Sequence, residues 1–469
     1  MSRQGGYRSW AWATTLTAAG LVVALAAPAV AAAAERAHLD VRVLAHVPSP
    51  GYPADAAIGP DGTIWTGSYF GASQYPGPSK VFAFSRTGQL RKTVTVLGQD
   101  LNGTHAVAAF AFDGEGRLYA GDYASGAGKD GRMLRFDTRT GAQEVYSTFP
   151  DIPVCSAAAP GTDCAQAAVD FAPGPDFAAF DGEGRLYVTD FQQGVIWRVP
   201  RGGGRPQLWL SDPRLDGGDF GPSGLQFLPD GRTLMFSVSS TSGVPVASPG
   251  VIYTVRVGDD GKPGSLREFW RSGPGDGPNG IAIAKSGNVY VTLSFAPSQV
   301  VELSPQGEEI ARVPAVPGQD PTMDPPFDTP SGIHFDGERL LVANIAYSSG
   351  DESHQVIFDV WAGEPGEPLF RPAVSPTVRP ERPRIRLRVR PATARVGERV
   401  RLRFRATRRG GTGPRAVAGA RIRVGRRFVL TNARGRAEAV AYFRRKGRAR
   451  MRASKAGFKG GGATIRVVR

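Results

Sequence analysis

The segments FAFDGEGRLYAGD (110–122) and AAFDGEGRLYVTD (178–190) share one pattern: two apolar residues, an Asp-Gly turn and a short alternating strand. Asp-Gly favours a tight hairpin turn, because glycine adopts a positive φ at little cost. The same pattern, with small variations, occurs six times along the chain. The other four copies are IGPDGTIWTGS (58–68), FLPDGRTLMFSV (227–238), IAKSGNVYVTLS (283–294) and HFDGERLLVANI (334–345).

The spacing of the six copies predicts the fold. A unit of this size, built from short strands and tight turns, is typical of a propeller blade. The segment LDVRVLAHV (39–47) is expected to pair with the last blade and close the ring. The sequence therefore predicts an all-β protein whose main body, 35–361, is a six-bladed β-propeller. The turn residues Asp61, Asp113, Asp181, Asp230, Ser286 and Asp336 lie 52, 68, 49, 56 and 50 positions apart, a mean of 55.

The longest gap, 68 positions, contains the only two cysteines of the chain, Cys155 and Cys164. A loop-closing disulfide is favoured over a metal pair, because the surrounding residues offer too few soft ligands and the chain carries an export signal. We interpret 151–175 as an extended loop, which is either a flap over one face of the propeller or a decoration of its outer side.

The first 34 residues are typical of a secretory signal peptide. Arg3 and Arg8 precede an apolar run over 16–30, and alanines at 31–34 offer a cleavage site before Glu35. An N-terminal membrane anchor is the alternative, although the run is short for a span of about 20 residues. We therefore expect a protein that is secreted or lies at the cell surface after cleavage.

Charge divides the chain into an acidic body and a basic tail. Residues 384–469 hold 28 Lys and Arg against 2 Glu, whereas the rest of the chain holds 29 basic and 40 acidic residues. The proline-rich segment 362–383 between them is interpreted as a semi-rigid linker. About seven short alternating strands predict a small Ig-like antiparallel β-sandwich over 384–469, which resembles modules appended to bacterial surface proteins.

The arginine excess of the tail has two interpretations. It is a solvated outer face, or it attaches the protein to an anionic surface such as a wall phosphate polymer, a membrane of anionic lipid or a polysaccharide. Nucleic acid binding is not expected, because aromatic residues for base stacking are sparse in the tail and an exported protein rarely meets nucleic acid.

Ligands of propellers bind at the mouth of the central channel, near the residues that begin each innermost strand. Three of the expected positions lie in similar strings, GPSGLQF (221–227), GPNGIAI (277–283) and TPSGIHF (329–335). Proline fixes the approach of the chain, and glycine is expected to let the backbone turn. Short side chains with oxygen atoms around an axis suit a hard cation such as calcium. Aligned on the turn motif, the six positions are Asp55 or its neighbours, Ala108, Asp176, Ser223, Asn279 and Ser331.

The PNGIA string at Asn279, the repeated DGxGRLYVTD pattern and the six-blade count resemble the senescence-marker-protein/gluconolactonase/luciferin-regenerating-enzyme family. They also overlap with strictosidine-synthase-like and NHL-repeat propellers. The resemblance covers roughly residues 39–361. It implies a calcium or related divalent ion at the axis, held by a Glu of the first blade, the Asn of the PNG string and an Asp of the next blade. That ion polarises a lactone carbonyl, and the Asp helps to activate water.

Only part of this site carries over to the chain. Asn279 matches the Asn, whereas Ser331 stands at the position of the Asp and Asp55 is the acid nearest to the position of the Glu. A shifted register, in which Asp176, Ser223 and Asn279 contact the axis, is the alternative.

We therefore expect Asn279 and Asp176 to be metal ligands, and Asp55, His105, Ser223 and Ser331 to contact a small-molecule substrate. For His105, a purely structural role is the alternative. The expected function is that of a secreted, lactonase-like, divalent-metal-dependent hydrolase of lactones or related esters. The alternative is a non-catalytic ligand-binding propeller that its basic tail holds at an anionic cell envelope.

Overall fold

The computed structural model describes residues 36–70, 75–99, 101, 105–124, 130–218, 220–241, 248–318, 323–374, 384–410, 413–425, 427–455 and 458–469. The expected signal peptide therefore lies outside the described residues, as does 375–383 of the expected linker. Within the described residues, no helix is long and apolar enough to cross a membrane.

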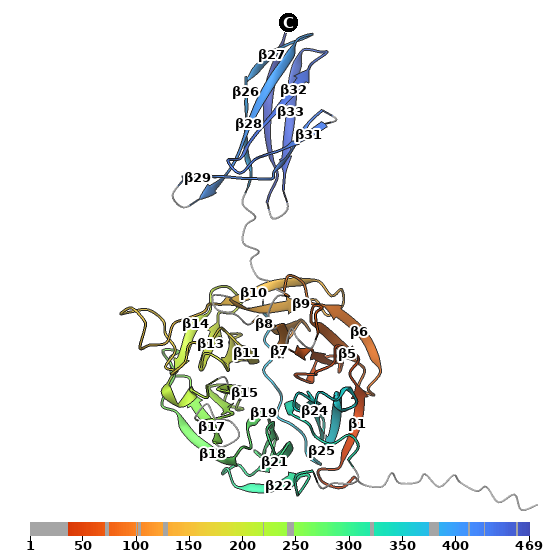
Figure 1. Cartoon of the computed structure of the whole chain (residues 1–469), viewed down its shortest axis with the longest axis vertical. Coiled ribbons are helices and arrows are strands. Elements are labelled where there is room, and N and C mark those ends of the chain that lie inside the picture. The colour runs from red at the N-terminus through yellow and green to blue at the C-terminus, as the bar shows by residue number, and fades with distance from the viewer. Residues whose placement is uncertain are drawn as a thin grey trace, which may run out of the picture. The chain divides into compact units, whose positions relative to one another are not determined.

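The body of the chain is a six-bladed β-propeller, as predicted (Figure 1). Each blade is an antiparallel sheet of four strands, and blade 2 gains a fifth short strand, β4 (Tyr69–Phe70). Blade 1 contains β2 (Ala57–Ile58), β3 (Ile64–Gly67), β5 (Lys80–Phe84) and β6 (Leu90–Thr95). Blade 2 contains β7 (His105–Phe112), β8 (Leu118–Ala124), β9 (Gly131–Phe136) and β10 (Gln143–Phe149). Blade 3 contains β11 (Pro175–Phe180), β12 (Leu186–Asp190), β13 (Val195–Val199) and β14 (Gln207–Ser211).

The remaining blades follow the same order. Blade 4 contains β15 (Pro222–Phe227), β16 (Thr233–Val238), β17 (Pro249–Arg256) and β18 (Arg267–Pro274). Blade 5 contains β19 (Pro278–Ile283), β20 (Val289–Leu293), β21 (Gln299–Leu303) and β22 (Glu309–Val313). Blade 6 contains β23 (Pro330–Asp336), β24 (Arg339–Asn344), β25 (Val356–Trp361) and, from the start of the chain, β1 (Val41–His46). Two 3-10 turns, η1 (Pro213–Leu215) and η2 (Glu352–His354), lie between strands.

The ring closes as predicted, because β1 pairs antiparallel with β25 and covers the open edge of the last blade. The innermost strands contact each other in the order β2, β7, β11, β15, β19 and β23, and β23 contacts β2 again. Buried apolar side chains of neighbouring blades form shared clusters, so the core is a set of layers between blades rather than one central core.

Glycine has two distinct uses in this ring. In the turns that revealed the repeat, a glycine has a positive φ in every blade, for example Gly62 at 80° and Gly287 at 93°. The glycines of the three Pro-x-Gly strings do not have a positive φ, so the expectation that they turn the backbone is wrong. A Cβ on Gly224 or Gly280 would lie 2.2 or 2.4 Å from a carbonyl oxygen of the next blade. These glycines allow neighbouring innermost strands to approach closely.

Residues 362–374, expected to begin a linker, instead form a segment that crosses one face of the propeller (Figure 1). We call residues 362–374 the strap. Its backbone bonds to blade 5 through the amide of Lys285 and the carbonyl of Ile283, at 2.9 and 2.8 Å. Composition alone gave the wrong prediction here. A proline-rich segment without a strand pattern can still pack against the face of a sheet when the neighbouring backbone offers hydrogen-bond donors.

The strap contacts all six blades. Phe370 meets Phe227 of blade 4 edge-on, and Gly366 packs against Phe335 of blade 6. Arg371 donates to the carbonyl of Ile58 in blade 1 at 2.6 Å. Further contacts join Pro372 to Gly114 of blade 2 and Ala373 to Arg201 of blade 3, and Val374 is fully buried between these two blades.

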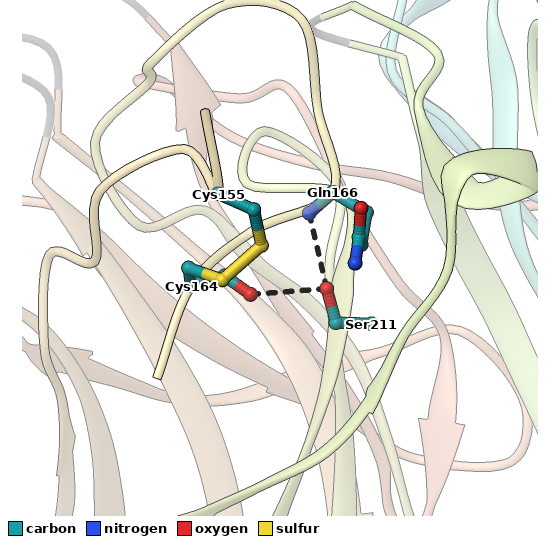
Figure 2. Close-up of a disulfide and its surroundings, with 4 residues drawn as sticks. All are labelled: Cys155, Cys164, Gln166 and Ser211. Carbon is teal, nitrogen blue, oxygen red and sulfur yellow. Dashed lines mark hydrogen bonds between the residues drawn. A yellow bond between two sulfur atoms is a disulfide. The ribbon is translucent and has the colours of Figure 1, made fainter. Parts of the chain in front are cut away.

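The long loop 151–175 contains the expected disulfide between Cys155 and Cys164 (Figure 2). Ser211, at the end of β14, fixes the loop, because its Oγ donates to the carbonyl of Cys164 and accepts from the amide of Gln166, both at 3.0 Å. The loop is thereby attached to the outer strand of blade 3. The structure thus favours the outer decoration over the flap.

The tail contains two sheets that share one buried cluster of apolar side chains. One sheet has the order β26 (Arg386–Arg390), β28 (Arg399–Gly410), β29 (Gly413–Ala416), with β32 (Arg436–Tyr442) also paired to β28. The other has the order β27 (Thr393–Arg395), β34 (Gly461–Val468), β33 (Gly447–Ser454), β30 (Arg421–Val424), β31 (Arg427–Leu430). Their pairing is antiparallel except for β27 and β34, which are parallel.

Candidate functional site

A cavity of about 260 Å³ lies at the end of the channel where the innermost strands begin. Its lower tier is formed by one residue from each blade, and in every blade but the second this residue directly follows a proline. We call these six positions the ring residues. They are Ala54, Ala108, Asp176, Ser223, Asn279 and Ser331, and all but Ala108 line the cavity.

The ring is polar on one side and apolar on the other. Blades 3 to 6 supply Asp176, Ser223, Asn279 and Ser331, whereas blades 1 and 2 supply alanines. Neighbouring polar residues bond in two pairs. The hydroxyl of Ser223 donates to Oδ2 of Asp176, and the hydroxyl of Ser331 donates to Oδ1 of Asn279 at 3.2 Å. Four of the six predicted site residues are thereby brought together.

An upper tier of side chains lies above the ring. We call its members the collar residues. In each blade, the residue before the ring residue pairs with a residue at or near the end of the second strand, and the collar residue directly follows that partner. Tyr69 stacks on Tyr123 with ring centroids 6.2 Å apart, and Tyr347 meets Tyr69 edge-on at 6.5 Å. The collar residues are Tyr69, Tyr123, Phe191, Ser239, Ser294 and Ile345, and Phe220, Phe295 and Tyr347 extend their wall.

Sequence reasoning missed this aromatic wall, although a signal was present. Asp122 and Asp190 occupy equivalent positions in the second strand of their blades, where each pairs with the residue before the ring residue, and the residues after them are Tyr123 and Phe191. A strand that ends at the channel mouth places its next residue over the channel. The repeated position therefore marked a binding wall one residue further along the chain.

Asp55 is not a ring residue, which corrects the alignment by one position. The isolated bridge between Pro53 and Ser68 matches the first pair of the other blades, so Ala54 occupies the ring position. Asp55 stands where blades 4 to 6 have glycine and is buried between blades 1 and 6. Its Oδ1 lies 2.8 Å from Nε2 of His334, and it does not line the cavity.

His105 does not reach the cavity either. It begins β7 as a fully buried residue, and its Nε2 lies 2.6 Å from the carbonyl oxygen of Gly77. The geometry therefore supports the structural alternative, because the imidazole is bonded to the segment before β5 and His105 does not line the cavity.

Asp176 is the group with unusual protonation. The pKa of Asp176 is raised from 3.8 to about 7, chiefly by burial and to a smaller extent by the nearby charges of Asp55 and Asp190. The hydrogen bond from Ser223 opposes this rise, because it stabilises the carboxylate. A carboxyl group with a pKa near neutrality can both accept and release a proton at physiological pH, which suits a general base.

The ring does not fit the calcium site that the family resemblance implies. Of its three ligand positions, only Asn279 keeps the expected residue, and Ala54 and Ser331 occupy the others. Asp176 would add one carboxylate, already bonded to Ser223. Calcium prefers six to eight oxygens and gains affinity with ligand charge. Within the described residues, no group of three or more His, Cys, Asp or Glu is placed to hold a metal ion.

The strap closes the opposite end of the channel. Leu369, Phe370 and Arg371 lie against the ends of the innermost strands and leave a space of only about 40 Å³. A ligand therefore has access to the ring from the collar side.

No family model matches the chain, and no curated protein matches its sequence. Among solved structures, it is similar to a calcium-binding protein, regucalcin, from Agrobacterium tumefaciens, with 17% identity over 72% of this chain and 98% of that one, and a TM-score of 0.47. A gluconolactonase from Xanthomonas campestris shows 16% identity over 69% and 98%, with a TM-score of 0.39. Virginiamycin B lyase from Staphylococcus aureus shows 15% identity over 69% and 99%, with a TM-score of 0.41. Likeness at this level does not define a reaction.

Proposed function

We propose that this protein is an exported, lactonase-like hydrolase that opens lactones or related small esters in the axial cavity, with Asp176 as general base. The observation that carries the proposal is the position of Asp176: its carboxyl, with a pKa near 7, lies on the floor of a cavity with an aromatic wall. Such a cavity, mostly apolar with a few convergent polar groups, is typical of a small-molecule site.

The chemistry follows from the two bonded pairs. Asp176 accepts a proton from water as the oxygen of that water adds to the carbonyl carbon of the substrate. Ser331 bonds to Oδ1 of Asn279, so the Nδ2 hydrogens of Asn279 are free to donate to the carbonyl oxygen as it gains charge. Asp176 then returns the proton to the leaving alkoxide, so that lactone and water give a hydroxy acid.

The two halves of the cavity suggest the shape of the substrate. The side of blades 1 and 2 offers alanines below and tyrosines above, whereas the side of blades 3 to 6 offers hydroxyl, carboxamide and carboxyl groups. A small ring with one apolar face and polar edges matches both sides. The volume of about 260 Å³ limits the substrate to one or two rings.

A panel of lactones and small esters tests the proposal on the full chain. Saturable hydrolysis of at least one member, inhibited by its product, is expected. If no member is hydrolysed while one of them raises the melting temperature, the alternative of a non-catalytic binding propeller is supported instead, because the cavity then binds without reacting.

Truncation of the wall tests where the substrate binds. Tyr347→Ala is expected to raise KM about tenfold with a small effect on kcat, because an aromatic wall contributes binding more than chemistry. Tyr347 is 51% exposed, so its loss should not disturb the core. Tyr442→Ala is the matched control, since Tyr442 is 55% exposed but lies on β32 of the tail. KM and kcat of both variants are measured by steady-state kinetics. Equal KM values for the two variants would indicate that the substrate binds elsewhere.

Chelation tests the donor set of the ring. EDTA is expected to change kcat/KM less than about twofold, because the protein offers one carboxylate and one carboxamide to a cation. Turnover and metal content are measured before and after chelation, with calcium added back. Loss of turnover that calcium restores would instead establish the divalent-metal-dependent hydrolase that the family resemblance implies, with Asn279 and Asp176 as its ligands.

A further inference from the structure

The tail carries a groove of about 1,400 Å³ that is lined by nine arginines. Three of these lie on or just before β26, and six belong to β30, β31 and β33. The groove therefore has a row of cations along each side. The groove lies in the tail and shares no lining residue with the axial cavity for which hydrolysis is proposed.

The floor between the two rows is low. Strand β34 contributes Gly461, Gly462 and Thr464 to the groove, and β26 contacts β34 on the far side. In the register of β33 with β34, Arg452 lies opposite Gly462, and Arg450 lies opposite Thr464. Each of these arginines thus has a neighbour with a small side chain or none, which leaves room for an extended chain along β34.

Within the described residues, no arginine of the groove forms an ion pair with the protein, and Nε of Arg423 donates to the carbonyl of Gly425 at 3.1 Å. Arg423 lies directly opposite Arg452, an arrangement that destabilises a sheet because like charges repel across strands. In the described part of the tail, the ion pairs are Arg395 with Glu398 and Arg403 with Glu438, and neither involves the groove. An external anion would remove this repulsion.

We propose that this groove binds a linear polyanion that carries a phosphate group in each repeat, as wall phosphate polymers do. The planar guanidinium of arginine forms two parallel hydrogen bonds to a phosphate group. The surface of the tail is poor in carboxylates and therefore cannot offer such an acceptor to each arginine of the groove. The concave shape with two flanking rows fits a single extended chain better than a flat membrane surface. Phe428, the one aromatic residue among the described lining residues, already holds the guanidinium of Arg421 3.7 Å from its ring centre, so that face is not open to a nucleic acid base.

The test compares two triple variants of the full chain by binding to long-chain sodium polyphosphate. Arg423, Arg450 and Arg452 are changed to Gln in the groove variant. Arg399 and Arg401 on β28 and Arg444 after β32, which are exposed and do not line the groove, are changed to Gln in the control. Both variants lose the same net charge. Circular dichroism and thermal unfolding establish that both remain folded.

The groove variant is expected to bind polyphosphate about 10- to 100-fold more weakly than the natural chain, with the control within about threefold. The slope of log K against log salt concentration is negative, and it should become shallower by about 2 to 3 in the groove variant, because three phosphate contacts are lost. Equal losses in both variants would overturn the proposal, since net charge alone would then explain binding. Retention of affinity by the groove variant, or tighter binding of the natural chain to single-stranded DNA or anionic vesicles than to polyphosphate, would overturn it as well.

Discussion

Replacement of Asp176 by Asn is expected to lower kcat/KM for lactone hydrolysis by about 10²- to 10⁴-fold and, above pH 7, to raise the melting temperature. The loss of activity follows because a carboxamide cannot accept the proton of the attacking water. The shape of the site should survive, since the Asn oxygen can still accept the hydrogen bond that Ser223 now donates to Asp176. Loss of turnover with gain of stability distinguishes a catalytic carboxyl from a structural one.

The gain of stability follows from proton linkage. The pKa of Asp176 is about 7 in the folded protein and 3.8 as its ordinary value. Below about pH 4, both folded and unfolded chains hold the proton, and Asp176 has no cost. Between about pH 4 and 7 the unfolded chain releases the proton and the folded chain keeps it, so the free energy of unfolding falls as pH rises. Above pH 7 the deficit stays constant, at about 1 to 3 kcal/mol after allowance for the partial exposure of Asp176 to the cavity.

The pH profile of the natural protein provides the control. If Asp176 is the base, kcat/KM should increase about tenfold per pH unit below pH 7 and level off above it. Ser223→Ala should move this midpoint to higher pH, because the hydrogen bond from Ser223 holds the pKa of Asp176 down. A profile that Ser223→Ala leaves in place, or an Asn variant that keeps full activity, would remove Asp176 from the mechanism.

The sequence predicted the propeller because the information that defines a blade is local. An Asp-Gly turn between two alternating strands specifies its own hairpin, and repetition alone then gives the ring. The polar ring residues of blades 3 to 6 were found for the same reason: a proline marks the start of each of those strands. Blade 1 failed because the distance from ring residue to turn residue varies, being five positions in blades 3 and 6 and seven in blades 4 and 5, so Asp55 and Ala54 could not be distinguished without the pairing of Pro53 with Ser68.

The collar and the strap could not be predicted in the same way, because both depend on contacts between distant segments. Tyr347 and Tyr69 lie near opposite ends of the propeller sequence and meet only after ring closure. Phe370 follows the last blade, yet packs on Phe227 of blade 4. Composition described the strap as a linker, and only the donors and apolar surface at the channel end, which no local pattern reveals, make it part of the body.

The strap has a mechanical role in the ring as well as closing the channel. Strand pairing closes the ring between β1 and β25, and the short strand β4 pairs with β7 where blades 1 and 2 meet, but most of the contact between neighbouring blades is side-chain packing. Val374 is fully buried between blades 2 and 3, and Phe370 packs against the clusters of blades 3 and 4. Loss of these two side chains should therefore loosen several blade interfaces at once.

The double variant Phe370→Ala/Val374→Ala is expected to lower the free energy of unfolding of the propeller by about 3 to 5 kcal/mol, because each truncation removes apolar burial and leaves a cavity. Tryptophan fluorescence during denaturation reports this transition alone, since residues 384–469 contain no Trp. The control is Leu369→Ala, where the side chain is 39% exposed and the expected cost is below about 1 kcal/mol. If the double variant were as stable as this control, residues 362–374 would be a linker and not part of the propeller. A linker that only lies over the propeller contributes nothing to its free energy of unfolding.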